Sequence, residues 1–386
     1  MNVAPWEALA LNNPEEEGQS RRVRMASQVY FFDFGNGSDV HAAIKKLVGK
    51  AGGEKIQRGM KVAVKSHFGE MGNYTHIRPS FVRSAVDAIK ELGGRPFFTD
   101  TTTLYPEGGR LTVADSLETA RYNGFTEEGL GCPVVIADAP DGESGVVIEN
   151  DKSKNVHLKR VKVAKAIAEA DAIIVLSHVK GHVMSGMGGA IKNLGMGCTT
   201  KGTKSAQHAL HGCEFDLEKC AGCGKCVESC TFGALRMVDG KPARGEGCVY
   251  CLTCMFNCEE RAIHLLEGGK ERFQEGLAEA AFGVTRAFVG KPVAYLNFVM
   301  DVTRLCDCAA PAGRLVVQNV GILASEDPVA IDKASLDLID GSQIIPGWQV
   351  SPPDILGKLN KTSSLIHIRT AARLGMGSME YTITGV

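Results

Sequence analysis

The sequence predicts an α/β fold with a mostly parallel sheet and a small inserted α+β module. Apolar runs typical of strands alternate with helical segments from about residue 25 to residue 212, and the alternation resumes after residue 268. Such alternation is typical of strand–helix–strand units around a parallel sheet. The stretch between them is dense in cysteine and glycine and breaks the pattern. We therefore expect one α/β domain, formed by residues 25–212 and 269–386, into which residues 213–268 are inserted.

The expected strands are short apolar runs rich in β-branched and aromatic residues. They are QVYFFDF (28–34), KVAVKS (61–66), PFFTD (96–100), PVVIAD (133–138), DAIIVLS (171–177), VAYLNFV (293–299) and RLVVQNV (314–320). The expected helices are one that starts at Pro79, the segments KVAKAIAEA (162–170) and AIKNL (190–194), ERFQEGLAEAAFGVTRAF (271–288), and one within 327–339 that starts at Pro328. Residues 1–24 are polar and aperiodic, so we expect a disordered tail, with Met25 as a candidate natural start.

The composition is that of a globular protein. Of its 386 residues 44% are hydrophobic and 23% are charged, which allows a sizeable core. The net charge of −1 gives no reason to expect nucleic acid or a membrane surface as a partner. No run approaches the roughly 18 apolar residues of a membrane span, and the first residues lack the features of a signal peptide. We expect a cytoplasmic protein, in which thirteen cysteines favour metal ligands or redox groups over disulfides. The oligomeric state is left open.

Eight of these cysteines form a repeated motif. CAGCGKCVESC, from Cys220 to Cys230, and CVYCLTCMFNC, from Cys248 to Cys258, share the spacing C-x2-C-x2-C-x3-C. Each cysteine of the second motif lies 28 residues after its counterpart in the first, which indicates an internal duplication. In bacterial-type ferredoxins with this spacing, three cysteines bind one [4Fe–4S] cluster and the fourth binds the other. The motifs therefore predict a 2[4Fe–4S] ferredoxin-like module.

The cluster ligands are expected to pair crosswise between the two motifs. One cluster would take Cys220, Cys223, Cys226 and Cys258, and the other would take Cys248, Cys251, Cys254 and Cys230. The alternative is two zinc sites of four cysteines each, although zinc requires neither the third cysteine nor the three-residue offset. The motifs depart from the usual ferredoxin pattern in one respect, because Thr231 and Glu259 follow the fourth cysteines where proline is common.

A glycine-rich segment upstream is a candidate anion site. It follows the strand at 171–177 and leads into the expected helix at 190–194, and the start of a helix favours bound anions. The candidate residues are Gly186, Gly188, Gly189 and Lys192. The segment matches neither the P-loop pattern nor the dinucleotide fingerprint, so the class of anion, a phosphate or a carboxylate, stays open. The alternative is a tight structural turn.

Several basic side chains fall at or just after expected strand ends, where open α/β sheets bind ligands. We take His67, His178, His182 and Lys180 as candidate acid–base or substrate-binding residues, with His76 as a further histidine at such a position. The alternative is that these histidines are surface residues or are satisfied by structural hydrogen bonds. A metal site formed by His178 and His182 on one helix face is disfavoured, because Gly181 and the preceding strand argue against a helix there.

Three further cysteines follow expected strands of the same domain. Cys198 ends the glycine-rich segment, and Cys306 and Cys308 lie in DVTRLCDC after the strand at 293–299. If they converge, their thiolates would suit a third iron–sulfur cluster with one iron open to a substrate. The alternative is that they are buried small residues, as free cysteines often are. Cys132 and Cys213 are taken as structural.

The chain as a whole resembles the DUF362 family, in the branch described as uncharacterised iron–sulfur centre proteins with an inserted ferredoxin domain. The resemblance rests on the double cysteine motif and on four segments, KSHFGEMGNYTHIRP (65–79), SHVKGHVMSGMGGAIKNLGMGC (177–198), DVTRLCDC (301–308) and ASEDPVAIDKASLDL (324–338). It extends over nearly everything from about residue 25 onward. It implies an α/β domain with a ferredoxin module in a cytoplasmic setting, often in anaerobes, and it implies no particular reaction.

Three functions are consistent with these features. The first is an electron-transfer protein or oxidoreductase that relays electrons through two [4Fe–4S] clusters to a redox partner protein, a small-molecule acceptor or a site in the α/β domain. The second is an enzyme that acts on an anionic small molecule at an open-iron cluster held by Cys198, Cys306 and Cys308. The third is a non-catalytic scaffold in which the clusters are structural. Whether the chain is an enzyme is left open.

Overall fold

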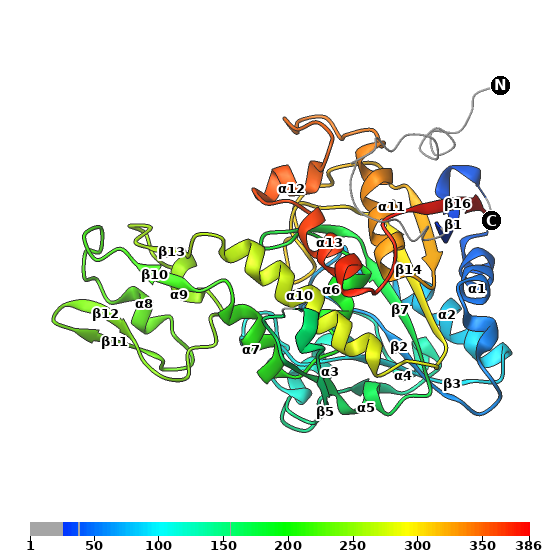
Figure 1. Cartoon of the computed structure of the whole chain (residues 1–386), viewed down its shortest axis with the longest axis horizontal. Coiled ribbons are helices and arrows are strands. Elements are labelled where there is room, and N and C mark those ends of the chain that lie inside the picture. Colours follow the sequence, from blue (N-terminus) through cyan, green and yellow to red (C-terminus); the bar gives the residue numbers. More distant parts are fainter. Residues whose placement is uncertain (1–25, 38, 155) are drawn as a thin grey trace.

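The main feature of the fold is an eight-stranded sheet in the order β16-β1-β15-β14-β7-β2-β3-β4 (Figure 1). The computed structural model describes residues 26–37, 39–154 and 156–386, so the expected tail and Met25 lie outside the described residues. Every neighbouring pair of strands is parallel except the two that contain β15. The strands are β1 (Ser27–Asp33), β2 (Lys61–Lys65), β3 (Arg95–Asp100), β4 (Val134–Ile136), β7 (Ala172–His178), β14 (Val293–Val299), β15 (Gly321–Ser325) and β16 (Tyr381–Gly385). The predicted α/β fold with a mostly parallel sheet is confirmed.

Helices cover both faces of the sheet, and each face has its own apolar core. Within β2, Val62 and Val64 point to one core and Ala63 points to the other, as the alternation of side chains along a strand requires. The first core lies under α1 (Val40–Lys50), α2 (Pro79–Glu91), α3 (Val113–Tyr122) and α4 (Glu127–Leu130). The second lies under α6 (Ala190–Gly195), α10 (Gly269–Arg286), α11 (Pro328–Asp340) and α13 (Leu365–Leu374). No helix in the described ranges is long and apolar enough to cross a bilayer.

Two of the expected elements are wrong. Residues 314–320 form no regular strand, because their backbone makes isolated bridges to two separate segments, Thr303↔Leu315 and Val317↔Ile344, and β15 starts only at Gly321. The expected helix at 162–170 is helical only in α5 (Lys165–Ala168). Its first residues belong to β6 (Arg160–Ala164), which pairs with β5 (Gly145–Glu149) and buries Val161 and Val163. In both cases a tertiary partner outweighs the local pattern.

The cysteine-rich segment projects from one end of the α/β domain, beyond α7 (Lys201–Ala209) and α10 (Figure 1). It consists of two small sheets, β10 (Cys213–Phe215) with β13 (Ile263–Leu265) and β11 (Leu235–Val238) with β12 (Lys241–Arg244), and two short helices. We keep residues 213–268 as the proposed bounds of this module.

The internal duplication is visible in the backbone of the module. Its helices α8 (Lys225–Glu228) and α9 (Thr253–Phe256) lie at the same 28-residue offset as the cysteines. Gly222 and Gly224 have φ values of 69° and 78°, and Tyr250 and Leu252, at the equivalent positions, have 54° and 69°. Such left-handed conformations are uncommon for residues other than glycine. The second loop therefore keeps the shape of the first even without its glycines.

Candidate functional site

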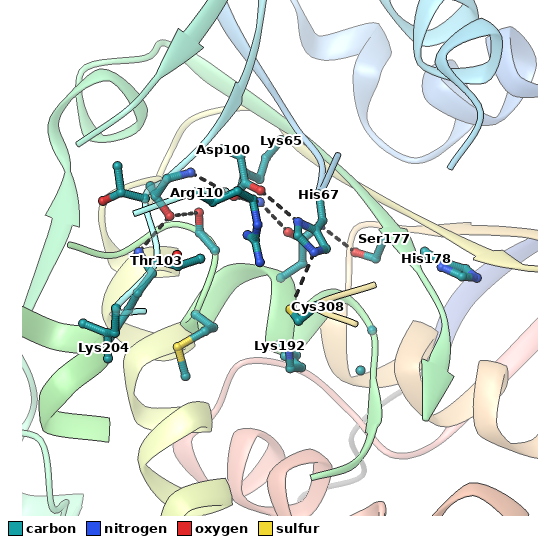
Figure 2. A pocket seen from close by; sticks show the side chains of 18 of the residues that line it. Lys65, His67, Asp100, Thr103, Arg110, Ser177, His178, Lys192, Lys204 and Cys308 are labelled. Atoms are coloured by element: carbon teal, nitrogen blue, oxygen red, sulfur yellow. Dashed lines mark hydrogen bonds and ion pairs between the residues drawn. The ribbon is translucent and has the colours of Figure 1, made fainter. Parts of the chain in front are cut away.

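A cavity of about 100 Å³ opens at the carboxyl ends of the central parallel strands (Figure 2). From β2 the chain passes through α2 to β3 on one side, whereas β7 lies on the other side of β2. This change of direction creates the crevice in which open α/β sheets bind ligands. Lys65 and Asp100, the last residues of β2 and β3, and His178, the last residue of β7, all line the cavity.

The wall of this cavity is rich in positive charge. Five cationic side chains line it, Lys65, Arg110, Lys180, Lys192 and Lys204, whereas Asp100 is the acidic residue in the same wall. Four of the five have carboxylate neighbours, in the pairs Lys65–Asp100 at 2.9 Å, Arg110–Glu70 at 3.2 Å, Lys180–Asp307 at 2.9 Å and Lys204–Asp138 at 3.9 Å. The Lys192 ammonium group has no carboxylate or hydrogen-bond partner among the described residues. Its charge is therefore available to a small anion, which we call the cavity ligand.

Lys204 is the cation of this wall whose charge should change near neutral pH. Its Nζ donates to Thr101 Oγ1 at 2.8 Å and to the Thr199 carbonyl at 2.6 Å, and burial lowers its pKa to about 8 despite the opposing charge of Asp138. As the pH rises through this value the amine loses its charge, so the affinity for sulfate, whose own charge is constant, should fall between about pH 7 and pH 9. Calorimetry should show weaker but pH-independent binding by Lys204→Met. A wild-type affinity that stays constant over this range would contradict the expectation.

His67 lies between a carboxylate and a thiol in the cavity wall (Figure 2). Its Nδ1 is 3.1 Å from Asp100 Oδ2, and its Nε2 is 3.6 Å from Cys308 Sγ. Burial opposes ionisation of Asp100, but Lys65 and His67 outweigh it and hold the pKa of this carboxyl well below its usual range. A hydrogen bond from the Cys306 thiol, assisted by His67, lowers the pKa of Cys308 well below that of an ordinary thiol. The predicted candidate His67 is thus placed at the cavity.

His178 and Lys180 converge on one buried carboxylate. His178 Nδ1 and Lys180 Nζ lie 2.8 and 2.9 Å from Asp307 Oδ2, and Thr75 Oγ1 donates to Asp307 Oδ1 at 3.0 Å. The other ring nitrogen of His178 lies 2.7 Å from the Met300 carbonyl oxygen. Since both nitrogens are engaged, His178 fixes the loop around Asp307 and is not free to exchange a proton with a cavity ligand. Lys180 remains part of the cavity wall.

The structure brings only some residues of the predicted anion site to the cavity. Gly188, Gly189 and Lys192 line the cavity, but Gly186 packs against Ser364 instead. The start of α6 is already occupied, because Asp332 accepts hydrogen bonds from the backbone N–H groups of Ala190 and Ile191 at 2.7 and 2.9 Å. The positive end of this helix therefore binds an internal carboxylate, and Lys192, two residues after Ala190 in the first turn, is the residue that faces the cavity.

Two further candidates lie away from the cavity. His182 is stacked on Phe273, and its Nδ1 accepts a hydrogen bond from Met184 N at 3.3 Å and lies 3.0 Å from Ser185 Oγ. Burial lowers the pKa of His182 well below the usual value. His76 packs against Phe125 in the core behind the sheet, where burial also lowers its pKa. Neither lines the cavity wall. The geometry favours structural roles for both.

The three additional cysteines are not brought together. Cys306 and Cys308 share a hydrogen bond, but Cys198 is packed into the apolar core, where its Sγ lies 3.6 Å from the Asn193 carbonyl oxygen. Burial raises the pKa of Cys198 to about 12, which disfavours a thiolate ligand. The hypothesis of a third cluster held by all three sulfurs is therefore not supported by the geometry.

The most informative residues that the sequence analysis missed are Lys65, Asp100, Arg110 and Lys204. Lys65 and Asp100 end two strands that the sequence correctly predicts, and a charged residue at a buried strand end was the available signal. Arg110 and Lys204 come from a loop and from α7, and neither position has a local pattern that predicts its place in the wall.

The eight motif cysteines surround two further cavities. One is lined by Cys220, Cys223, Cys226 and Cys258, and the other by Cys248, Cys251, Cys254 and Cys230. We call these the first and second cysteine cavities. Their sulfurs surround a space rather than a point, since no three His, Cys, Asp or Glu side chains in the described part of the chain are placed to share a single metal ion. Cys213 also lines the second cavity, and Arg244 donates to its Sγ at 2.8 Å.

The second cysteine cavity and the cationic cavity meet at one contact. Tyr250 lines the former, His208 lines the latter, and the His208 Nδ1 lies 3.4 Å from the Tyr250 carbonyl oxygen. Burial lowers the pKa of His208 to about 3, so its ring is neutral. Phe273 packs edge-on against His208, and Met196, also in the cationic wall, packs against the apolar residues of the module. A lining residue of the cationic cavity is thus in direct contact with a lining residue of the second cysteine cavity.

A family described as "Domain of unknown function (DUF362)" matches residues 62–337. The chain belongs to the DUF362 family. The match spans the strands that form the cationic cavity, and the family assigns no reaction to it. No curated protein matches this DUF362 chain.

Two solved structures resemble this DUF362 chain at low similarity. One is the lactate racemase apoprotein from Thermoanaerobacterium thermosaccharolyticum, with 10% identity and a TM-score of 0.34 over 74% of this chain and 53% of that chain. The other is a protein from Thermotoga maritima, with 11% identity and a TM-score of 0.35 over 67% of this chain and 49% of that chain. The chain spans about half the length of both proteins.

Proposed function

We propose that this DUF362 chain is an iron–sulfur oxidoreductase that passes electrons between a redox partner protein and an anionic small molecule bound in the cationic cavity. The observation that carries the proposal is the contact between His208 and Tyr250, which places the second cysteine cavity next to the cationic cavity. A module that only stored or exchanged electrons with other proteins would not need to be joined to a binding site.

The cysteine cavities fit two [4Fe–4S] clusters. Each cavity is lined by four motif cysteines, three from one motif and the fourth from the other, which is the ligand arrangement of two-cluster ferredoxins. The left-handed backbone at Gly222, Gly224, Tyr250 and Leu252 gives both loops the same shape around their cavities. When bound, the clusters would accept and supply single electrons. In the α/β domain, His67 would exchange protons with the cavity ligand, and the surrounding cations would bind its negative charge.

The cationic cavity fits a small phosphate or carboxylate. Lys192 offers an uncompensated charge, and Arg110, held by Glu70 at 3.2 Å, offers a planar group suited to bidentate contact with such anions. Buried pairs such as Lys65–Asp100 fix these cations before a ligand arrives, so little order is lost on binding. A ligand here would lie beside His208, on the side of the cavity that faces the module.

Iron and sulfide analysis of the full-length protein, purified without oxygen, tests the proposal. We expect about eight irons and about eight sulfides per chain, as two [4Fe–4S] clusters require, and electron paramagnetic resonance signals that appear on reduction and vanish on reoxidation. Zinc in place of iron would overturn the proposal. Clusters that could not be reduced would instead favour the scaffold function, in which they only stabilise the module.

A further inference from the structure

We propose that Cys308 is a nucleophile of the cationic cavity, with His67 as its acid–base partner, and that its substrate is an anionic carbonyl compound. The inference rests on the anion-binding part of the proposed function and names the substrate class for that site. It does not depend on the third-cluster hypothesis, because Cys198 is packed elsewhere.

The geometry is that of a nucleophile, a base and a group that orients the base. His67 Nε2 is 3.6 Å from Cys308 Sγ, and His67 Nδ1 is 3.1 Å from Asp100 Oδ2. The carboxylate selects the ring orientation in which Nε2 faces the thiol, as in cysteine and serine hydrolases of unrelated fold. Asp100 is itself fixed by Lys65 at 2.9 Å, so the three groups are held by buried contacts.

Cys308 is also the accessible member of its Cys-x-Cys pair. Its side chain is half-buried and lines the cavity, whereas Cys306 is buried and does not line it. A donated S–H and a nearby cationic Lys192 both stabilise negative charge on Cys308, and the thiolate is the nucleophilic form of cysteine. The two cysteines therefore have different roles, one as the attacking sulfur and the other as its hydrogen-bond donor.

The chemistry of the cavity selects the substrate class. The cations would bind a carboxylate or phosphate, and a thiolate beside them suits an electrophilic carbonyl carbon on the same molecule. In the addition step the Cys308 proton passes to His67 Nε2, and the sulfur electron pair forms the C–S bond. The π pair of the carbonyl moves to its oxygen, which then takes the proton from His67. The product is a hemithioacetal or hemithioketal with a hydroxyl group, and no oxidant or leaving group is needed.

Site-resolved alkylation of the full-length protein tests this inference. Iodoacetate should modify Cys308 at least about tenfold faster than Cys306 or Cys132, which are buried thiols. The ratio of the reaction rate with iodoacetate to that with neutral iodoacetamide should be higher at Cys308 than for a small thiol in solution. Lys192→Gln should reduce that preference, and Asp100→Asn should slow both reagents because His67 is no longer oriented. Cys308→Ser should leave no modified residue in the cavity.

The carbonyl is tested by protection with matched anions. Glyoxylate should protect Cys308 from iodoacetamide more strongly than glycolate, which has the same charge and no carbonyl. Equal protection by the two anions, or a Cys308 no more reactive than Cys306, would overturn the inference. Iron and sulfide are counted in the same samples, so loss of the clusters with a reactive Cys308 would contradict the proposed electron transfer alone. Intact clusters with an inert Cys308 would contradict the nucleophile alone.

Discussion

Replacing Cys251 by serine should remove about half of the iron, leaving about four irons per chain, because it breaks one of two separate [4Fe–4S] clusters. Cys251 lines the second cysteine cavity together with Cys248, Cys254 and Cys230. The crosswise pairing also predicts which cysteine variants lose the same cluster. Cys230→Ser should remove the same resonance signal as Cys251→Ser, although Cys230 belongs to the first motif, and Cys258→Ser should remove the same signal as Cys223→Ser.

A cysteine outside the module provides the matched control. Cys132 is buried in the α/β core, where burial raises its pKa to about 11, and Cys132→Ser should keep all of the iron. The module must also remain folded for the comparison to be valid, and unchanged retention of the other cluster in each variant shows this directly. If Cys230→Ser and Cys220→Ser abolished the same signal, the crosswise assignment would be refuted.

Replacing Asp307 by alanine should lower the free energy of unfolding by about 3–5 kcal/mol, the usual cost of removing one partner from a buried ion pair. Asp307 is fully buried, and it accepts from His178, Lys180 and Thr75 at 2.8, 2.9 and 3.0 Å. Burial opposes its ionisation, but His178 and Lys180 hold the pKa of Asp307 well below its usual range. Alanine would leave these two basic groups in a low-dielectric site without a counter-charge. Denaturant unfolding monitored by circular dichroism measures the change.

An exposed pair shows what the same substitution costs without burial. Glu149 pairs with Arg160 at 2.7 Å, but these side chains are 54% and 75% exposed. Glu149→Ala should therefore change the free energy of unfolding by less than about 1 kcal/mol. A loss for Asp307→Ala as small as that for Glu149→Ala would show that the network around Asp307 does not hold the loop that carries Cys308.

The fold could be predicted from the sequence because its signals are local. Buried parallel strands such as 171–177 are continuous apolar runs, and the helix at Pro79 has a periodic apolar face ended by Gly93. The strand expected at 314–320 failed for a physical reason. Val316 and Val317 are buried, but the segment around them forms bridges to two different segments of the chain. No local sequence pattern distinguishes such a buried loop from a strand.

The site could be predicted only where a residue type and a strand end coincide. His67 and Lys180 follow strands, so both were candidates, and both line the cavity. The role of Asp332 could not be foreseen, because it caps α6 from a helix that follows more than one hundred residues later. Because the Asp332 carboxylate occupies these N–H groups, the start of the helix is not open to an external anion. Cys198 failed as a ligand because its side chain turns into the core, which sequence position does not reveal.

The central claim is that a ligand in the cationic cavity and the cluster in the second cysteine cavity are electrostatic neighbours. The direct test is to measure the reduction potentials of both clusters with and without sulfate, with chloride at equal ionic strength as the control. An anion beside a cluster disfavours the added electron, so sulfate should lower the potential of the cluster bound by Cys251 more than that of the other. The difference should disappear in Lys192→Gln. Equal shifts of the two potentials, or no shift at either cluster, would contradict the account.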